Sequence, residues 1–218
     1  NRAAAYASLG DVERALADYN TALERDPQLG AAYAGRARLY EDLKKADLAL
    51  ADYTKAIELA PAMTSAYLSR ANLYSQRGDL DAALADYTKA IELEVTLSTA
   101  YLGRGNVYAA KADQDKAIAD YSKALEINPA LIPAYLNRGN AYAVKGEHDK
   151  AVADHSKAIE LDPKLAVAYF MRGNDYALKA DYETAVADFT QALALDPTLT
   201  IAYVNRGNAY NNLGATDL

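Results

Sequence analysis

One stretch of about thirty residues recurs along nearly the whole length of this chain. At 134–163 it reads AYLNRGNAYAVKGEHDKAVADHSKAIELDP, and near-copies lie on both sides of it. Prolines mark the period, with Val95 in the one place where a proline is missing: Pro27, Pro61, Pro129, Pro163 and Pro197. A fixed spacing of 34 residues indicates a repeat array, in which each unit buries its apolar face against its neighbours.

We end each repeat two residues after its marker. A single array then spans 1–218, with a partial repeat at 1–29, full repeats at 30–63, 64–97, 98–131, 132–165 and 166–199, and a terminal half repeat at 200–218. Because the first and last repeats are incomplete, we expect the sequence to be a piece of a longer protein. Exposed repeat ends would also allow copies to associate end to end.

Each period contains two amphipathic helical patterns. The first carries apolar residues at helical spacing, such as Tyr135, Ala141 and Tyr142, and ends where glycine recurs, at Gly10, Gly78, Gly146 and Gly214. The second stops before the proline, because the residue ahead of a proline disfavours helix. The sequence therefore predicts an all-α fold, a right-handed solenoid of stacked helix-turn-helix repeats.

Columns of equivalent positions indicate how these helices pack. Three columns hold only small residues, which let helix axes approach closely: Ala3, Ala37, Ala71, Gly105, Gly139, Gly173 and Gly207; Ala15, Ala49, Ala83, Ala117, Ala151 and Ala185; Ala22, Ala56, Ala90, Ala124, Ala158 and Ala192. All but one of the 18 tyrosines fall in three further columns. We interpret them as core packing, with stacking of nucleobases or sugars as the alternative.

With these residues in place, the chain resembles the tetratricopeptide repeat family. The 34-residue period, the aromatic followed by a small residue four positions on, and the later Tyr, Ala, aromatic, Ala and Pro all match the family's signature, over essentially the entire chain. The resemblance implies that the first helices line a concave surface on which peptides are laid.

One departure from the family pattern is systematic. Arg replaces the commonest Leu before the small residue, and an Asp recurs in the second helix: Arg2, Arg36, Arg70, Arg104, Arg138, Arg172 and Arg206, with Asp18, Asp52, Asp86, Asp120, Asp154 and Asp188. The pattern predicts an Arg–Asp pair between the two helices of a repeat. An Arg ladder open to an acidic ligand is the alternative.

The candidate site lies on the predicted groove face of the first helices. An asparagine column and an apolar row share this face, with two further asparagines beside them: Asn72, Asn106, Asn140, Asn174 and Asn208; Leu68, Leu102, Leu136, Phe170 and Val204; Asn137 and Asn205. Asn offers a donor and an acceptor, so a row of them could hold a peptide backbone. The row resembles the asparagine ladder in the repeat domain of O-GlcNAc transferase. The alternative is that these side chains bind backbone or interhelix groups and pack.

Composition excludes several classes of function. The net charge of −7, without any Lys/Arg cluster, argues against nucleic-acid binding. No apolar run is long enough to insert into a membrane. The absence of Cys excludes disulfides and thiolate metal sites, and it suits cytosol or periplasm, of which we slightly favour the cytosol.

Catalytic and cofactor motifs are absent, so we predict a chain that is not an enzyme and that holds no cofactor or metal. His148 and His155 lie seven residues apart, but His155 replaces a core aromatic and is interpreted as structural. Asp175 stands where the equivalent positions hold Leu39, Leu73, Val107 and Ala141, and the sequence offers no reason for it.

These observations favour a protein–protein interaction scaffold that binds a peptide segment of a partner in its groove. The resemblance also implies that a clamp for acidic chaperone tails is missing, because its Lys and Arg positions here hold uncharged residues. Two alternatives stay open. One is a substrate-recruiting arm of a larger enzyme, such as a glycosyltransferase. The other is a self-assembling structural array.

Overall fold

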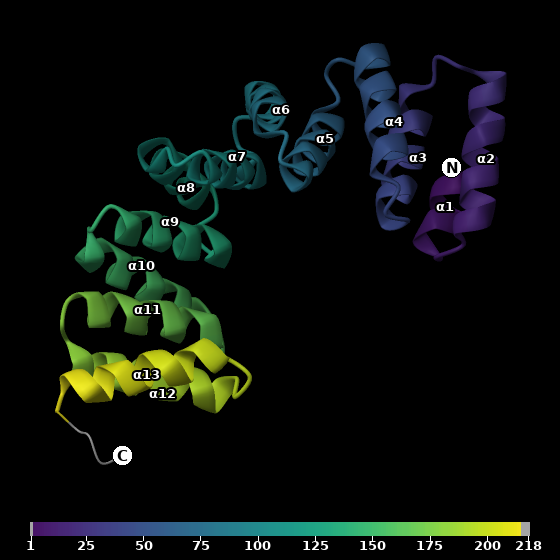
Figure 1. The fold of residues 1–218 in the computed structure, drawn as a ribbon. Helices are drawn as coiled ribbons and strands as arrows, with labels where there is room; N and C mark the ends of the chain where they lie inside the picture. The colour runs from purple at the N-terminus through teal and green to yellow at the C-terminus, as the bar shows by residue number, and fades with distance from the viewer. Residues whose placement is uncertain (1, 215–218) are drawn as a thin grey trace. The chain divides into compact units, whose positions relative to one another are not determined.

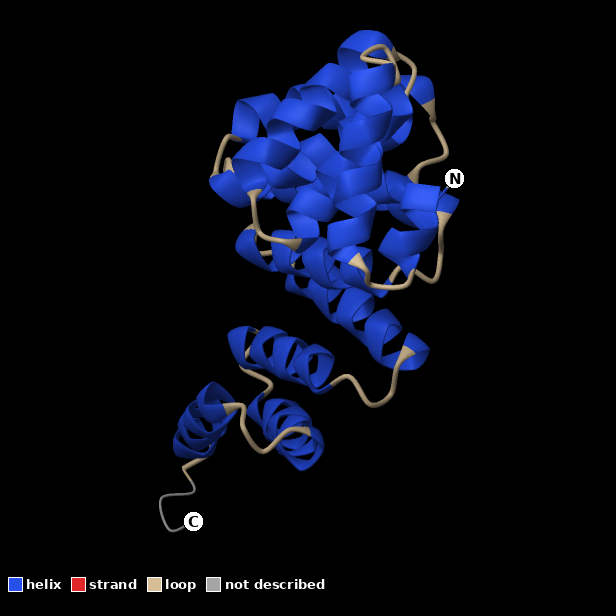
Figure 2. Ribbon diagram, turned by 90° about the vertical axis from the view of Figure 1, so that its right-hand side faces the viewer, coloured by secondary structure: helices blue, strands red, loops and turns tan. Residues whose placement is uncertain are grey.

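The computed structural model describes residues 2–214, and within that range its regular elements are all α helices (Figure 2). The predicted all-α class is confirmed. The helices of the described range are α1 (Arg2–Ser8), α2 (Val12–Arg25), α3 (Gly30–Asp42), α4 (Ala46–Leu59), α5 (Thr64–Arg77), α6 (Leu80–Leu93), α7 (Ser98–Ala110), α8 (Gln114–Ile127), α9 (Ile132–Val144), α10 (His148–Leu161), α11 (Ala166–Leu178), α12 (Tyr182–Leu195) and α13 (Thr200–Asn212). Odd-numbered helices are the first helices of the predicted repeats, and even-numbered helices are the second.

The chain divides into two compact units, unit 1 at 1–107 and unit 2 at 108–218. In unit 1, each helix from α1 to α5 packs on the next, so the series ends with α5 on α6. In unit 2, each helix from α8 to α12 packs on the next, and α11 also contacts the first helices α9 and α13. Figure 1 shows these layers from α9 to α13. The stacking of helix pairs is as predicted, while the repeat boundaries and the single array stay predictions.

The turn inside each repeat uses one left-handed residue after the first helix. Glycine takes this place at Gly78 and Gly146, with φ of 82° and 77°. The repeats without glycine adopt the same conformation, with φ of 59° at Lys44, 61° at Ala112 and 60° at Ala180. The glycine turns were predicted from the sequence, but these three were missed because the repeat geometry imposes the conformation on residues that disfavour it.

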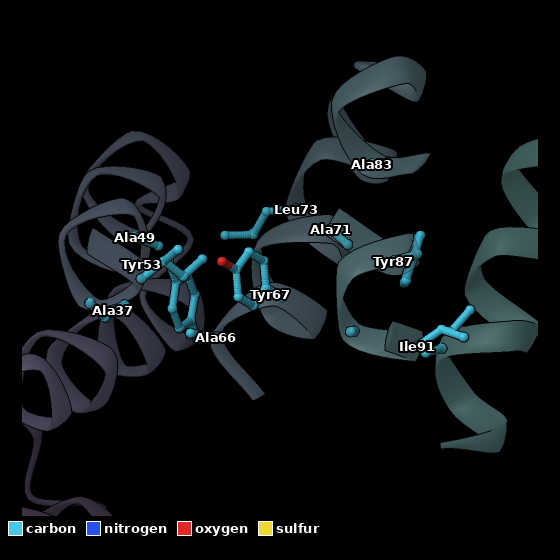
Figure 3. Packing of buried hydrophobic residues seen from close by; sticks show 14 of the residues in the cluster. Ala37, Ala49, Tyr53, Ala66, Tyr67, Ala71, Leu73, Ala83, Tyr87 and Ile91 are labelled. Carbon is cyan, nitrogen blue, oxygen red and sulfur yellow. The ribbon is translucent and has the colours of Figure 1, made fainter. Parts of the chain in front are cut away.

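Small residues allow the close packing of the helices. Ala49, Ala83 and Ala56 are fully buried and lie in a core cluster of unit 1 with Tyr53 and Tyr87. Figure 3 shows the rings of Tyr53 and Tyr87 together with Ala49 and Ala83 among the packed helices of this unit. The alanine columns therefore serve as predicted, since a larger side chain at the contact would separate the helices.

The second-helix tyrosines are core residues. Tyr19, Tyr53, Tyr87 and Tyr121 are buried, and burial raises the pKa of Tyr87 and of Tyr121 to about 12. The ring of Tyr87 lies so close to Gly103 that a Cβ atom there would meet it at 2.4 Å. The packing interpretation of this tyrosine column is confirmed.

The predicted Arg–Asp pairs are present and bidentate. Arg138 donates from Nε and Nη2 to the two carboxylate oxygens of Asp154, both at 2.7 Å. The same geometry joins Arg36 to Asp52, Arg70 to Asp86 and Arg172 to Asp188. The hydrogen bond to the aspartate raises the pKa of the arginine in these pairs.

Each arginine also reaches the preceding repeat. Arg138 Nη1 donates to Ser122 Oγ at 2.9 Å, and its guanidinium lies 5.8 Å from the ring centre of Tyr135. Arg172 repeats this arrangement with Ser156 and Tyr169. The alternative interpretation, an arginine ladder exposed to an acidic ligand, is therefore wrong for these repeats, because the guanidinium groups link helices inside the stack.

Candidate functional site

The predicted site residues all lie on first helices. In unit 1, Leu68 and Asn72 belong to α5, and Leu102 and Asn106 belong to α7. In unit 2, Leu136, Asn137 and Asn140 belong to α9, Phe170 and Asn174 to α11, and Val204, Asn205 and Asn208 to α13. Since residues four apart share a helix face, the apolar residue and the column asparagine of each helix lie on one side of it. Each unit thus carries its own part of the asparagine row.

Unit 2 brings three of these asparagines together around a pocket. This α11–α13 pocket has a volume of about 460 Å³ and opens between the two first helices, with α12 contributing to its wall. Its lining consists of Asn174, Ala177, Leu178, Tyr182, Phe189, Asn205, Asn208, Ala209 and Asn212. No residue of this lining carries a charge, and its amides and apolar side chains are the groups expected of a surface for a neutral ligand.

The amides of the α11–α13 pocket are linked between helices. Asn205 Nδ2 donates to Asn174 Oδ1 at 2.8 Å, so the two first helices are joined at the pocket. Asn212 Nδ2 donates to the backbone oxygen of Asn208 at 2.8 Å. Asn174 Nδ2 and Asn205 Oδ1 have no hydrogen-bond partner among the described residues, so the pair leaves one donor group and one acceptor open.

The apolar row of unit 2 is divided between packing and exposure. The rings of Phe170 and Phe189 lie 6.0 Å apart, and Phe170 packs partly against the core. Val204 is exposed on α13, whereas Leu136 is half-buried on α9. Phe170 therefore packs beside the Phe189 ring that lines the pocket, and Val204 faces outward.

Asn72 in unit 1 has a structural partner. The hydroxyl of Tyr87 donates to Asn72 Oδ1 at 2.5 Å, although Asn72 is exposed. In the preceding repeat, where the column holds Arg38, the hydroxyl of Tyr53 donates to Glu41 instead. A column asparagine can thus hold a core tyrosine and still present its amide to solvent.

An equivalent pocket in unit 1 has a different lining. This α1–α3 pocket has a volume of about 320 Å³ and is formed by residues at the same repeat positions: Ala4, Ala7, Ser8, Tyr19, Gly35, Arg38, Leu39 and Asp42. Here Arg38 and Asp42 stand where the α11–α13 pocket has Asn208 and Asn212. The same framework therefore forms a charged pocket in unit 1 and an uncharged one in unit 2.

Two residues of the α11–α13 pocket come from the second helix and were missed by sequence reasoning, which considered first helices alone. Phe189 belongs to the core aromatic column, and Tyr182 is the one tyrosine outside the three tyrosine columns. The off-column tyrosine was the signal that could have identified this wall of the pocket.

The two histidines do not form a metal site. His155 is 1% exposed, and its Nδ1 lies 2.6 Å from Asp175 Oδ2 on the next helix, which is 2% exposed. Asp149 instead pairs with Lys179, and Asp154 with Arg138. No group of three or more His, Cys, Asp or Glu within the described range could hold a metal ion. The structural interpretation of His155 is confirmed, and Asp175 is explained as its buried partner.

Charged residues of the second helices lie on an exposed surface. Lys55, Lys89, Lys123 and Lys157 pair with the glutamate three residues further on, at distances between 2.7 and 3.0 Å. Exposed pairs of this kind contribute little to stability, typically below about 1 kcal/mol. A search of the described helices also finds none long and apolar enough to cross a membrane.

Comparison with known sequences identifies the repeat type. Sequence profiles described as tetratricopeptide repeat match residues 1–29, 30–63, 64–95 and 132–165, and one described as TPR repeat matches 105–146 and 173–214. Among curated proteins, no sequence matches the chain.

Several solved structures share the fold. YrrB, described as a TPR protein with an unusual peptide-binding site, is 24% identical with a TM-score of 0.75, over 87% of this chain and 97% of its own. MamA is 29% identical with a TM-score of 0.72, over 76% of this chain and 97% of its own. A tetratricopeptide repeat protein from Parabacteroides merdae is 22% identical with a TM-score of 0.78, over 98% and 85% of the two chains.

Proposed function

Because the chain belongs to the tetratricopeptide repeat family and is a protein-interaction scaffold, we propose that it binds an extended, uncharged peptide segment of a partner protein along its first helices. The observation that carries this proposal is the α11–α13 pocket, which combines four asparagines with apolar side chains and has no charge in its lining. Peptide groups have one donor and one acceptor each, which matches what the Asn174–Asn205 pair leaves open.

The residues proposed to contact the peptide are the predicted ones. Asn amides would hold its backbone, and the apolar row would contact its side chains: Asn72, Asn106, Asn137, Asn140, Asn174, Asn205 and Asn208, with Leu68, Leu102, Leu136, Phe170 and Val204. YrrB, with its peptide-binding site, is a precedent for this use of the fold. No catalytic step is proposed for the chain, and a partner protein is the only ligand required.

The test is binding of a random dodecapeptide display library by the full chain. Enriched peptides are synthesised with neutral ends, and their affinity is measured for the wild type and for Asn140→Ala combined with Asn174→Ala. We expect at least a tenfold loss, because two backbone contacts are removed, whereas the exposed second-helix change Glu160→Ala should have no effect. Unchanged affinity in the double variant would move the site away from the first helices.

Self-association is a second candidate, favoured by one observation. Ile201 and Val204 are exposed on α13 and share a helix face because they lie three residues apart, and adjacent exposed apolar side chains are typical of contact surfaces. Sedimentation velocity over a concentration series tests it, since a self-associating chain sediments faster as its concentration rises. An unchanged sedimentation coefficient would count against this candidate.

A further inference from the structure

The α11–α13 pocket differs from the other end of the chain in the way its aromatic ring is placed. In unit 1, the ring of Tyr19 lies over α3, where a Cβ atom on Gly35 would be 2.4 Å from the tyrosine hydroxyl. In unit 2, position 205 is an asparagine and the ring of Phe189 lies against α11 instead, where a Cβ atom on Gly173 would be 2.8 Å from it. The ring therefore leaves space beside α13, and the volume is about 460 Å³ compared with 320 Å³ in the α1–α3 pocket.

Much of the wall of this space is apolar, and its side-chain polar groups are the asparagine amides and the hydroxyl of Tyr182. Phe189 replaces the tyrosine of unit 1, so the hydroxyl is absent from the floor, and Ala177, Ala209 and Leu178 add apolar surface. An apolar cavity of about 150 Å³ is enough to hold benzene. The pocket is therefore large enough for a leucine, methionine or phenylalanine side chain together with part of its backbone.

Exposed apolar side chains extend the surface beyond the pocket. Leu178 is 63% exposed, and Val144 at the same position on the neighbouring helix α9 is 72% exposed. The equivalent positions on α1, α3 and α5 hold Ser8, Asp42 and Gln76. Burying large apolar side chains contributes about 25 cal/mol for each Å² removed from water, so an apolar partner gains free energy by contacting Leu178 and Val144.

We infer that the α11–α13 pocket is the anchor site of the scaffold. It takes one large apolar side chain of an extended, locally uncharged segment of a partner protein, while Leu178 and Val144 contact the residues beside it. The absence of charge in the lining selects against a charged anchor, because burying an unpaired charge there would be costly. The inference rests on the proposed peptide binding and adds the chemistry of the bound residue.

The experiment compares surface variants on the same neutral-ended dodecapeptides obtained from the library. We expect the binders to share one leucine, methionine or phenylalanine flanked by uncharged residues, and replacement of that residue by aspartate to weaken binding at least tenfold. Leu178→Asp should weaken binding to the same degree, and Leu178→Ala several-fold. Leu48→Asp is the matched control, because Leu48 is 48% exposed on a second helix, and it should change the affinity less than twofold.

Three outcomes would overturn the inference. If peptide affinity depends on Asn140 and Asn174 but is unchanged by Leu178→Asp and by replacement of the peptide's apolar residue, the proposed peptide binding is retained and the anchor site is refuted. If the library yields no binder, both the peptide binding and the anchor site are refuted. If Leu178→Asp converts a self-associated wild type to monomer in sedimentation velocity, the pocket is occupied by a second copy of the chain. Circular dichroism of both Leu178 variants checks that they fold, as their exposed position predicts.

Discussion

The buried His155–Asp175 pair offers the sharpest test of how the repeats are held together. The pair joins α10 to α11, and His155 Nε2 also lies 3.3 Å from the backbone oxygen of Leu136. Both ring nitrogens therefore face acceptors, and both can donate only when the imidazole is protonated. The next repeat junction provides the comparison. Phe189 and Ala209 occupy the positions equivalent to His155 and Asp175 there, and neither has a polar side chain.

The perturbation is a double-variant cycle that converts the first junction into the second. His155→Phe leaves the carboxylate of Asp175 buried without its partner, and should cost about 3 kcal/mol, at the low end for a broken buried pair. Asp175→Ala leaves one nitrogen of the buried imidazole without a partner, which costs about 2 kcal/mol. The combined variant reproduces the packing of Phe189 and Ala209, and should lose no more than about 1 kcal/mol. The expected coupling energy is therefore about −4 kcal/mol.

The assay is urea unfolding followed by circular dichroism, together with hydrogen exchange of the α10 and α11 amides. Exchange is needed because repeat arrays can unfold in parts, so a single transition cannot be assumed. We expect faster exchange at this junction in both single variants and nearly normal exchange in the combined one.

The reciprocal experiment controls for position. Ala209→Asp should destabilise unit 2 because the new carboxylate faces Phe189, and adding Phe189→His should recover most of that loss. Additive losses within about 0.5 kcal/mol at either junction would refute the idea that the pair acts as one unit.

Three further predictions concern single residues. Asp154→Ala should cost about 3 kcal/mol in urea unfolding, at the low end for a buried pair because the Arg138 side chain keeps 20% exposure; a loss below about 1 kcal/mol would contradict it. Lys44→Gly should stabilise the protein by about 1 kcal/mol, because φ at this residue is 59°, and a lower melting temperature would argue against strain there. Burial raises the pKa values of Tyr87 and Tyr121 to about 12, so the free energy of unfolding should fall as pH rises from 10 to 12, because the tyrosines of the unfolded state ionise first. In a pH titration, the absorbance of tyrosinate should show a late step near pH 12, and Tyr87→Phe should reduce it. A late step of unchanged size in Tyr87→Phe would count against the burial argument.

Much of the fold could be predicted from the sequence because the same signals recur in every period. A single Arg and a single Asp would have suggested little, but their joint recurrence predicted the pairs seen at Arg36, Arg70, Arg138 and Arg172. The contacts that could not be predicted cross from one repeat to the next. The column comparison showed that His155 and Asp175 are each unusual for their column, but it did not connect them. Only the packing of α10 on α11 shows that the two residues are hydrogen-bond partners.

The candidate site was predictable in part for the same reason. Helical periodicity predicted that the candidate asparagines lie on the same face of their first helices, and two from the column, Asn174 and Asn208, line the α11–α13 pocket together with Asn205. The side on which a core ring lies depends on which neighbouring helix offers a residue without a side chain, as Gly35 does for Tyr19 and Gly173 does for Phe189. That choice depends on pairs of positions in different helices, which no single column reveals.

The separation of structural from variable positions explains how one framework can carry different pockets. The buried charges of each repeat are satisfied by residues of the stack itself, as in the bidentate Arg138–Asp154 pair and its serine partner. Apart from links such as the Asn174–Asn205 hydrogen bond, residues that face the groove can therefore change without the loss of a buried ion pair. The α1–α3 and α11–α13 pockets show the result, because both are formed by the same repeat positions, yet one holds Arg38 where the other holds Asn208. Under the proposed function, binding specificity would then be set by these few exposed positions, and changes at Asn208 or Leu178 should alter the choice of partner before they alter stability.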